Sequence, residues 1–420
     1  CTVTYTANTY TVAFAMNGAT SKSNETWTYD TAYNLPNQSK TFKVNITNSA
    51  SATLSATSAS KAQTFKGWTT STSAGLSTST AKMGTTSSPT TSWDGSITKN
   101  TYFKNLRTTS GTVIFTANWT PVAFNLPTVS KTGNACKWNT KSDGTGTSYN
   151  SGASYTPTET SASNVTMYAV CTKNSYEVTL NKGTGIESVT GAGTYEYGKS
   201  VTINATAKEG YTWSEWTGTK ASEEKEYTFT MPAGDVTNTA NATANSYKLG
   251  YTLNGGTSGT SAPTTATYDQ AVTISNPTKT VTVTGNVNGT GATIGNATSG
   301  KQTFAGWISS SINTSTAYYG STAWTNTSTK TSAYTLSSAK SSYNGYRYRC
   351  IVTATSFKNL TPTSNATVTM VANWTPVAFN LPTITKTGYT CDWNTKSDGS
   401  GTSYDSGESY TPTANSAASV

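Results

Sequence analysis

The chain has 420 residues and a net charge of +9, with 34% hydrophobic, 11% aromatic and 11% charged residues and no histidine. Its lysines and arginines are dispersed rather than clustered as in a nucleic-acid binder, and no apolar run reaches the roughly 18 residues that span a membrane. We therefore expect neither nucleic-acid binding nor membrane insertion of this segment. Because the chain has no histidine, it also lacks the residue that most often serves as general base and metal ligand in proteins.

The residues that are abundant indicate the fold class. Threonine, valine, tyrosine and tryptophan recur along the whole chain, and these residues fit the half-buried surface of a sheet. Disordered chains are poor in aromatic residues, whereas 25 tyrosines and 11 tryptophans are present here. We predict a folded, mostly β protein made of several small cores in an elongated array.

Long internal repeats organise the sequence. Residues 117–165 return at 372–420 with 37 of 49 positions identical, so that ANWTPVAFNLP occurs at Ala117–Pro127 and again at Ala372–Pro382. QTFKGW at Gln63–Trp68 returns as QTFAGW at Gln302–Trp307, 239 rather than 255 residues further on. The second copy therefore has 16 extra residues (255 − 239), near SSYNGYRYRCIVTATS. We interpret the chain as two copies of a long and a short unit, separated by a divergent unit.

Strand signals mark where each unit begins and ends. Polar residues alternate with Val, Leu and Phe in these segments. Most of the strands that begin a unit are followed by a tight turn, N-G or similar. Opening strands are predicted at Tyr10–Gly18, Tyr176–Gly183 and Tyr247–Gly256. Closing strands are predicted at Val113–Trp119, Val165–Cys171, Val236–Ala242 and Val368–Trp374.

These signals divide the chain into six segments. In chain order we expect the tail of a preceding module (1–8), a long β module (9–119), a short module (120–171), a divergent short module (172–244), a long module with an insert (245–374) and a truncated short module (375–420). Within the insert, Tyr343–Ser356 resembles a strand of an immunoglobulin-like domain. The alternative is a strand inserted in the long module, with Cys350 as a buried free thiol. The tryptophans expected to anchor the cores are Trp68, Trp119, Trp138, Trp216, Trp307, Trp374 and Trp393.

The short units carry motifs that resemble a known family. GYTCDWNTKSDGSGTSYDSGESYTP at Gly388–Pro412 and its counterpart at Lys131–Pro157 resemble the Listeria–Bacteroides repeat, the B-repeat of internalin-type surface proteins. Tyr176–Ala242 is similar to a divergent version, through EGYTWSEWTG and FTMPAGDVTNTA. The resemblance implies β-grasp-like modules of a bacterial cell-surface protein. It covers the long units only at their ends and at the F-x-G-W motif.

No residue set in the sequence predicts catalysis or metal binding. Asp143 and Asp398 lie in repeated NTKSDG segments, but a calcium loop needs further oxygen ligands and a closing Glu, so we predict D-G hairpin turns there. The acidic run at Ser222–Tyr227 is interpreted as a solvated turn. Trp213 and Trp216, three residues apart, are expected on opposite faces of one strand, so that only one belongs to the core. We predict no enzyme and no cofactor.

The cysteines predict a cross-link. Cys136 lies two residues before a tryptophan, and Cys171 ends the closing strand of the same short unit, 35 residues later. A module of about 50 residues has little core and usually needs such a staple, so we expect a disulfide here, with two buried free thiols as the alternative. By the 255-residue period, Cys391 should pair with a position six residues beyond Val420, and Cys1 with a residue upstream. A disulfide would place the protein outside the cell.

Three functions are compatible with this organisation. The first is a stalk or fibre section of a secreted, multi-modular bacterial surface protein, whose partners are neighbouring modules of the same or identical chains. The second is an adhesin that binds host glycan or protein through the long units, and the third is a subunit of a self-assembling filament. In a stalk the inserts should pair with neighbouring modules, whereas in an adhesin they should surround a cleft. We interpret ANWTPVAFNLP as a joint, because proline ends the strand there.

Overall fold

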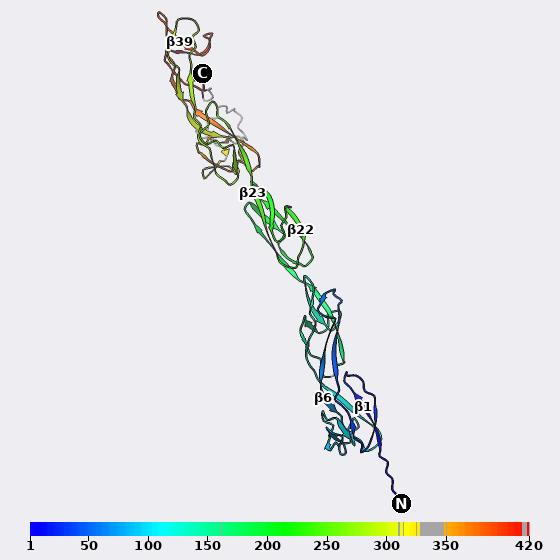
Figure 1. Ribbon diagram of the computed structural model, residues 1–420. Coiled ribbons are helices and arrows are strands. Elements are labelled where there is room, and N and C mark those ends of the chain that lie inside the picture. Colours follow the sequence, from blue (N-terminus) through cyan, green and yellow to red (C-terminus); the bar gives the residue numbers. More distant parts are fainter. Residues whose placement is uncertain are drawn as a thin grey trace. The chain divides into compact units, whose positions relative to one another are not determined.

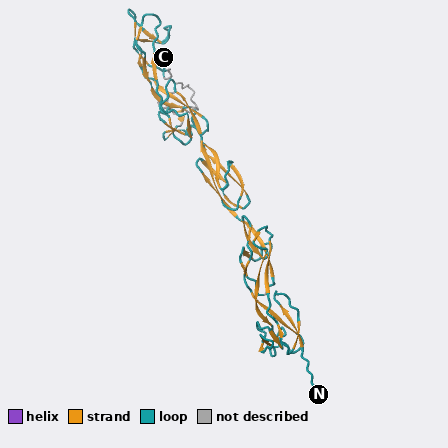
Figure 2. Ribbon diagram, in the orientation of Figure 1, coloured by secondary structure: helices purple, strands orange, loops and turns teal. Residues whose placement is uncertain are grey.

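The computed structural model describes residues 1–159, 161–309, 311–313, 315–324, 326–327, 348–349, 351–413 and 418–419. All regular elements in these residues are strands, and Figure 2 shows strands and loops without a helix, which confirms the predicted mostly β class. The β-grasp arrangement and the elongated array stay predictions. The chain forms two compact units, one of residues 1–176, 194–199 and 230–235, and the other of 177–193, 200–229 and 236–420.

An eight-stranded sheet runs through the first unit in the order β14-β13-β16-β4-β6-β10-β1-β2. Its strands are β14 (Ser148–Asn150), β13 (Asn134–Asn139), β16 (Asn164–Lys173), β4 (Lys40–Thr47), β6 (Ser58–Thr69), β10 (Thr112–Thr120), β1 (Thr9–Ala15) and β2 (Glu25–Thr28). A second sheet has the order β3-β9-β7-β8, with β3 (Tyr33–Asn34), β9 (Tyr102–Lys104), β7 (Lys82–Gly84) and β8 (Thr91–Ser92). Two short pairs, β11 (Phe124–Asn125) with β15 (Ser154–Tyr155) and β12 (Val129–Ser130) with β5 (Thr53–Leu54), complete the unit.

The core of the first long module follows from strand alternation. Along β10 every second side chain is buried, and Phe115 contacts Trp68, Trp27 and Trp93. β1 lies beside β10 in parallel, with Thr11 to Ala15 opposite Thr112 to Thr116. The opening and closing strands of the module are therefore direct neighbours.

One ribbon joins the long and the short module of this unit. β6 is long enough to pair with β10 at one end and with β4 at the other (Figure 1). β4 in turn pairs in parallel with β16, the closing strand of the short module. Phe42 and Val44 of β4 are buried in one cluster with Trp138, so the ribbon supplies part of the core of the short module. The sheet thus crosses the boundary expected at residue 119.

The second unit contains most of the divergent module, without its residues 172–176, 194–199 and 230–235, and the second long and short modules. In the divergent module, β17 (Ser175–Lys182), β23 (Val236–Ala244) and β21 (Tyr211–Gly218) are neighbours in that order, and β18 (Ile186–Thr190), β20 (Ser200–Ala207) and β22 (Glu226–Thr230) form a second sheet (Figure 1). The long module has the sheets β25-β24-β36-β30 and β26-β35-β31-β32. Their strands are β25 (Thr265–Thr267), β24 (Ser246–Thr252), β36 (Thr367–Thr375), β30 (Thr303–Ile308), β26 (Val272–Thr273), β35 (Ser356–Lys358), β31 (Tyr318–Tyr319) and β32 (Thr322–Ala323).

The rest of this unit consists of paired short strands. They are β27 (Thr280–Val283) with β29 (Thr298–Lys301), β28 (Thr293–Ile294) with β38 (Ile384–Thr385), β33 (Asn326–Thr327) with β34 (Tyr348–Arg349), β37 (Phe379–Asn380) with β41 (Ser409–Tyr410), and β39 (Asp392–Asn394) with β40 (Ser403–Asp405). By sequence, β27 and β29 correspond to β4 and β6. Six of the 14 residues of the expected immunoglobulin-like strand at Tyr343–Ser356, among them Cys350, lie outside the described residues.

The prediction that Trp213 and Trp216 face opposite sides of their strand is wrong. Trp216 is fully buried and Trp213 partly so, but their ring centroids are only 5.4 Å apart. The register of β21 against β23 shifts between Trp213 and Glu215, and such a bulge interrupts the strict alternation of side chains. Both rings therefore lie on the same side.

Candidate functional site: the joints between modules

The repeated ANWTP segment is held by a glutamine from the other repeated motif. The backbone N–H of Val122, just after Pro121, donates to Gln63 Oε1 (2.7 Å), and Gln63 Nε2 donates to Val122 O (3.4 Å). Gln302 makes the same two bonds with Val377, at 2.8 and 3.2 Å. Both glutamines are buried, so these bonds satisfy amides that would otherwise be costly to bury. QTF and ANWTPV are thus two halves of one joint.

A buried lysine completes this joint. Lys40 is only 4% exposed, and its Nζ donates to Asn17 O (2.6 Å) and to Ser161 O (2.8 Å). The ammonium also lies 5.8 Å from the ring of Trp119, whose Nε1 donates to Met16 O (3.1 Å). Burial lowers the pKa of Lys40, because desolvation disfavours the charged form. The cation thereby connects a turn of the long module to a loop of the short one.

The second copy repeats these contacts. Lys279 is 2% exposed, and its Nζ donates to Asn254 O (2.8 Å) and lies 5.8 Å from the ring of Trp374. Trp374 Nε1 donates to Leu253 O (2.9 Å). The same chemistry at both places supports the interpretation of ANWTPVAFNLP as a joint. Sequence reasoning missed the lysine and the glutamine, although both recur at the 239-residue spacing.

A second kind of joint lies between β23 and β24 and consists of one residue, Asn245. Its N–H donates to Gly210 O (2.9 Å), and its carbonyl oxygen accepts from the N–H of Tyr268 (2.8 Å). Both polar atoms of its side chain are also hydrogen-bonded. Thr212 Oγ1 donates to Asn245 Oδ1 (2.6 Å), and Asn245 Nδ2 donates to Pro362 O (2.6 Å). With all four groups bonded, Asn245 holds the divergent module against the long module.

Two tyrosines and an aspartate pack beside Asn245. The rings of Tyr211 and Tyr268 meet edge to face at 5.9 Å, and Tyr211 Oη donates to Asp269 Oδ2 (2.7 Å). Gly210 lies under the ring of Tyr268, where an added Cβ would come within 2.3 Å of it. Asp269 also accepts from Asn359 Nδ2 (3.0 Å) and lies 3.3 Å from Lys358 Nζ. A larger residue at position 210 would therefore separate the two modules.

The joint shifts the pKa of two of its groups. The hydrogen bond to Asp269, together with desolvation and the negative charge of the carboxylate, raises the pKa of Tyr211 to about 12. The hydrogen bonds that Asp269 accepts from Tyr211 and Asn359 lower the pKa of its carboxyl group, and the hydrogen bond and positive charge of Lys358 lower it further. Because folding raises the pKa of Tyr211 above its ordinary value of 10.0, this group stabilises the joint fully below pH 10. This contribution is lost as pH rises towards 12.

We expect Tyr211 to titrate in the near-ultraviolet tyrosinate absorbance at about pH 12. Subtracting the titration of the Tyr211→Phe variant isolates this group from the other tyrosines. In an Asp269→Asn background the difference curve should move towards 10, because the negative charge is removed. A difference curve with its midpoint near 10 in the unmodified chain would show that the bond to Asp269 is not formed.

Parts of the Asn245 arrangement recur in the first unit. Asn174 N–H donates to Gly133 O (2.9 Å), and Tyr197 N–H donates to Asn174 O (2.9 Å). A Cβ on Gly133 would come within 2.2 Å of the Tyr197 ring. Asn8 likewise accepts from the N–H of Tyr29 (2.8 Å). An asparagine immediately before an opening strand, in N-[ST]-Y, is the sequence signal that could have predicted these contacts.

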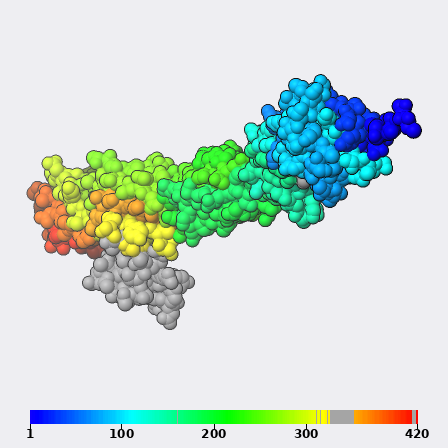
Figure 3. Space-filling view, turned by 90° about the horizontal axis from the view of Figure 1, so that it is seen from below, coloured from blue at the N-terminus to red at the C-terminus, as the bar shows by residue number. Residues whose placement is uncertain are grey.

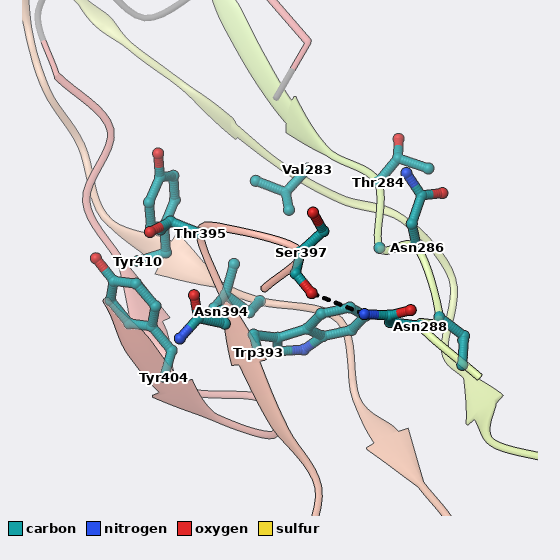
Figure 4. Close-up of a pocket in the computed structure, with 13 residues that line it drawn as sticks. Val283, Thr284, Asn286, Asn288, Trp393, Asn394, Thr395, Ser397, Tyr404 and Tyr410 are labelled. Carbon is teal, nitrogen blue, oxygen red and sulfur yellow. Dashed lines mark hydrogen bonds between the residues drawn. The ribbon is translucent and has the colours of Figure 1, made fainter. Parts of the chain in front are cut away.

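The tryptophans singled out from the sequence lie in the module cores, with one exception, and two of the cysteines form a disulfide. Cys136 and Cys171 face each other across β13 and β16 and form a disulfide, with Cα atoms 4.1 Å apart. Cys1 and Cys391 are free. Trp68, Trp119, Trp138, Trp216, Trp307 and Trp374 are all at most 4% exposed. Trp393 is only partly buried and lines an open pocket (Figure 4), and its role as a core tryptophan stays a prediction.

The acidic residues considered as ligands have ordinary structural roles. Asp143 Oδ1 accepts from the N–H and hydroxyl of Thr145, and these bonds lower the pKa of its exposed carboxyl. The hairpin is organised by Asn139, which is buried and bonds five neighbouring groups. Among the described residues no group of three His, Cys, Asp or Glu side chains could hold a metal ion. In the same residues no helix is long and apolar enough to cross a bilayer.

Comparison with known families agrees with the repeats in the structure. Residues 104–170 and 355–417 match the Listeria-Bacteroides repeat domain, and residues 176–246 match the divergent InlB B-repeat domain. No protein of curated function matches the chain. The first two matches contain the closing strand of a long module, the ANWTP joint and the hairpin of a short module. The third begins at Tyr176 and ends just after Asn245. These three segments of the chain are therefore similar to Listeria-Bacteroides repeat and divergent InlB B-repeat domains.

Proposed function

We propose that the chain is a load-bearing section, a stalk or fibre, of a secreted multi-modular bacterial surface protein, and that it catalyses no reaction. The domain families that these segments resemble are typical of bacterial surface proteins, which supports an extracellular location. The internal disulfide fits an oxidising compartment. Its partners are then neighbouring modules of the same or identical chains.

The observation that carries this proposal is the parallel pairing of opening and closing strands. β1 pairs with β10, β17 with β23 and β24 with β36, each in parallel over five residue pairs. In a parallel pair, the start of one strand and the end of the other lie at opposite ends of the ladder. Tension between the entry and the exit of a module therefore shears the whole ladder at once instead of breaking its bonds one after another.

The arrangement of the inserts favours a stalk over an adhesin. The ribbon of β4 and β6 pairs with β16 of the adjacent short module, and β28 pairs with β38. An adhesin insert would instead surround a cleft with accessible aromatic side chains. Among the described residues, the exposed large aromatic side chains are Tyr5, Tyr318 and Tyr389, and they lie at separate places along the chain. We therefore place the ligand-binding alternative second.

Single-molecule stretching tests the load-bearing role. Handles at Ser246 and Thr375, the start of β24 and the end of β36, load the pair in shear, whereas handles at Ser246 and Thr367 peel it from one end. We expect the full chain to unfold this module at a clearly higher force in the shear geometry. Both handle variants use a chain in which Cys1, Cys350 and Cys391 are serine. Equal forces in both geometries would contradict a load-bearing role.

A further inference from the structure

The first short module is attached to the first long module at two separate places. Its chain starts where β10 ends, at Thr120. Its closing strand β16 pairs in parallel with β4 of the ribbon, from Asn164 opposite Lys43 to Tyr168 opposite Thr47. In the first unit the cyan and turquoise residues of the short module lie beside the blue residues of the long module (Figure 3). Tension on the short module therefore acts against both attachments.

The ladder between β16 and β4 takes this tension first. β16 continues through Asn174 into β17, so tension from the following modules enters β16 at its C-terminal end. At the opposite end of the ladder Lys40, the first residue of β4, is held by its bonds to Asn17 O and Ser161 O. Because the pulled end and the held end lie at opposite ends of a parallel pair, the five residue pairs are loaded in shear.

The disulfide determines what happens once this ladder separates. Cys136 and Cys171 lie opposite each other across β13 and β16 and are joined covalently. Tension that reaches Cys171 then passes through the two sulfur atoms to Cys136, and from there along residues 121–135 to the end of β10. The residues between the two cysteines, 137–170, form a closed loop that carries no tension.

The closed loop contains the parts of the module that hold one another. Trp138, Met167 and Ala169 belong to one buried cluster, and all three lie inside the loop. Asn139 bonds five groups of the β13–β14 hairpin, and these groups also lie inside it. Only β11, β12 and the first residues of β13 are on the tensioned path. The hairpin therefore stays available as a template on which residues 121–136 pair again when tension falls.

The length of chain that the module can release depends on the disulfide. Without it, residues 121–174 between β10 and β17 can all be drawn out, to about 190 Å when fully extended. With it, only residues 121–136 and 171–174 can, which gives about 70 Å. The difference of about 120 Å is the extended length of residues 137–170.

We propose that the Cys136–Cys171 disulfide is an extension stop, which limits how far the first short module lengthens under tension and which a dithiol reductant releases. This inference rests on the proposed load-bearing role, since only tension along the chain engages the stop. Both cysteine side chains are partly exposed. A thiolate of the reductant attacks one sulfur, and its second thiol then displaces that sulfur from the mixed disulfide. The reductant leaves as a disulfide, and Cys136 and Cys171 gain two electrons and two protons as thiols.

The test stretches the full 420-residue chain through peptide tags fused to its two ends, so that no thiol serves as a handle. After the modules have been extended at constant force in the oxidised state, dithiothreitol is added. We expect one further step that corresponds to about 120 Å of contour length. In a Cys136→Ser and Cys171→Ser chain the step should be absent, and the unfolding increment of this module should be longer by the same amount. The main measurement uses the unmodified chain, so a folding defect of the variant cannot explain its result.

A matched control assigns the step to one pair of cysteines. A chain in which Cys1, Cys350 and Cys391 are serine should give the same step on reduction. No step after reduction, or equal increments with and without the disulfide, would overturn the proposal. The comparison of shear and peel forces concerns β24 and β36 and does not involve these cysteines. Equal forces there with a step here would reject the load-bearing role alone, and the converse would reject the extension stop alone.

Discussion

Replacing both Cys136 and Cys171 by serine should lower the free energy of unfolding of the first short module by about 4 kcal/mol, the value that the chain-entropy model gives for a loop of this length. The cysteines are 35 residues apart and join β13 to β16, the strand that the core of the module depends on. Native-state hydrogen exchange of the amides in β13 and β16 measures the change locally, which matters in a chain of several modules.

The chain offers a matched control for this variant. Cys391 occupies the same position in the second short module but is free, so Cys391→Ser should leave exchange in the hairpin of β39 and β40 unchanged. Addition of a reductant should reproduce the effect of the double substitution in the unmodified chain. Identical exchange in the β13 and β16 amides with and without the disulfide would contradict a stabilising role.

Trp138→Ala should cost about 3–5 kcal/mol, as is usual when a buried aromatic side chain is removed from a packed core. Trp138 is fully buried, and its Nε1 donates to Pro127 O (2.8 Å). Trp393 makes the same bond to Pro382 O (2.7 Å) but is only partly covered. Trp393→Ala should therefore cost clearly less, because less apolar surface is returned to water.

Comparison of these two variants by hydrogen exchange separates the effect of burial from that of residue type. Both tryptophans lie in WNTKSDG segments of identical sequence, so local propensities are equal. If the two substitutions have equal effects, the closing strand contributes little to the core.

Local patterns in the sequence were sufficient to predict the opening and closing strands and one disulfide. Alternation marked β1, β10, β16 and β36, and the placement of Cys136 and Cys171 relative to the strand and the tryptophan indicated their pairing. These features depend on residues close in sequence or on a motif repeated in each unit. A hairpin near Asp143 was predictable for the same reason, but its form was not, since β13 and β14 are joined by residues 140–147 and Asn139 organises this loop.

Pairings between distant segments were not predictable in this way. Nothing in the local sequence of β4 shows that it pairs with β16, about 120 residues away, and so the ribbon shared by two modules was missed. The bulge at Trp213 was missed because alternation assumes an unbroken ladder. Trp393 was expected in a core because a tryptophan recurs in the middle of each unit, whereas the burial of its counterpart Trp138 depends on packing against β4 and β16.

The ribbon of β4 and β6 also has a consequence for how such an array could grow during evolution. A short module duplicated by itself would lack β4, and the edge of its β16 would be left unpaired and prone to aggregation. Only a copy that includes the preceding long module brings the ribbon with it. The heritable unit of lengthening is therefore the long and short pair, and the near-identity of residues 117–165 and 372–420 is what copying of that pair would leave behind.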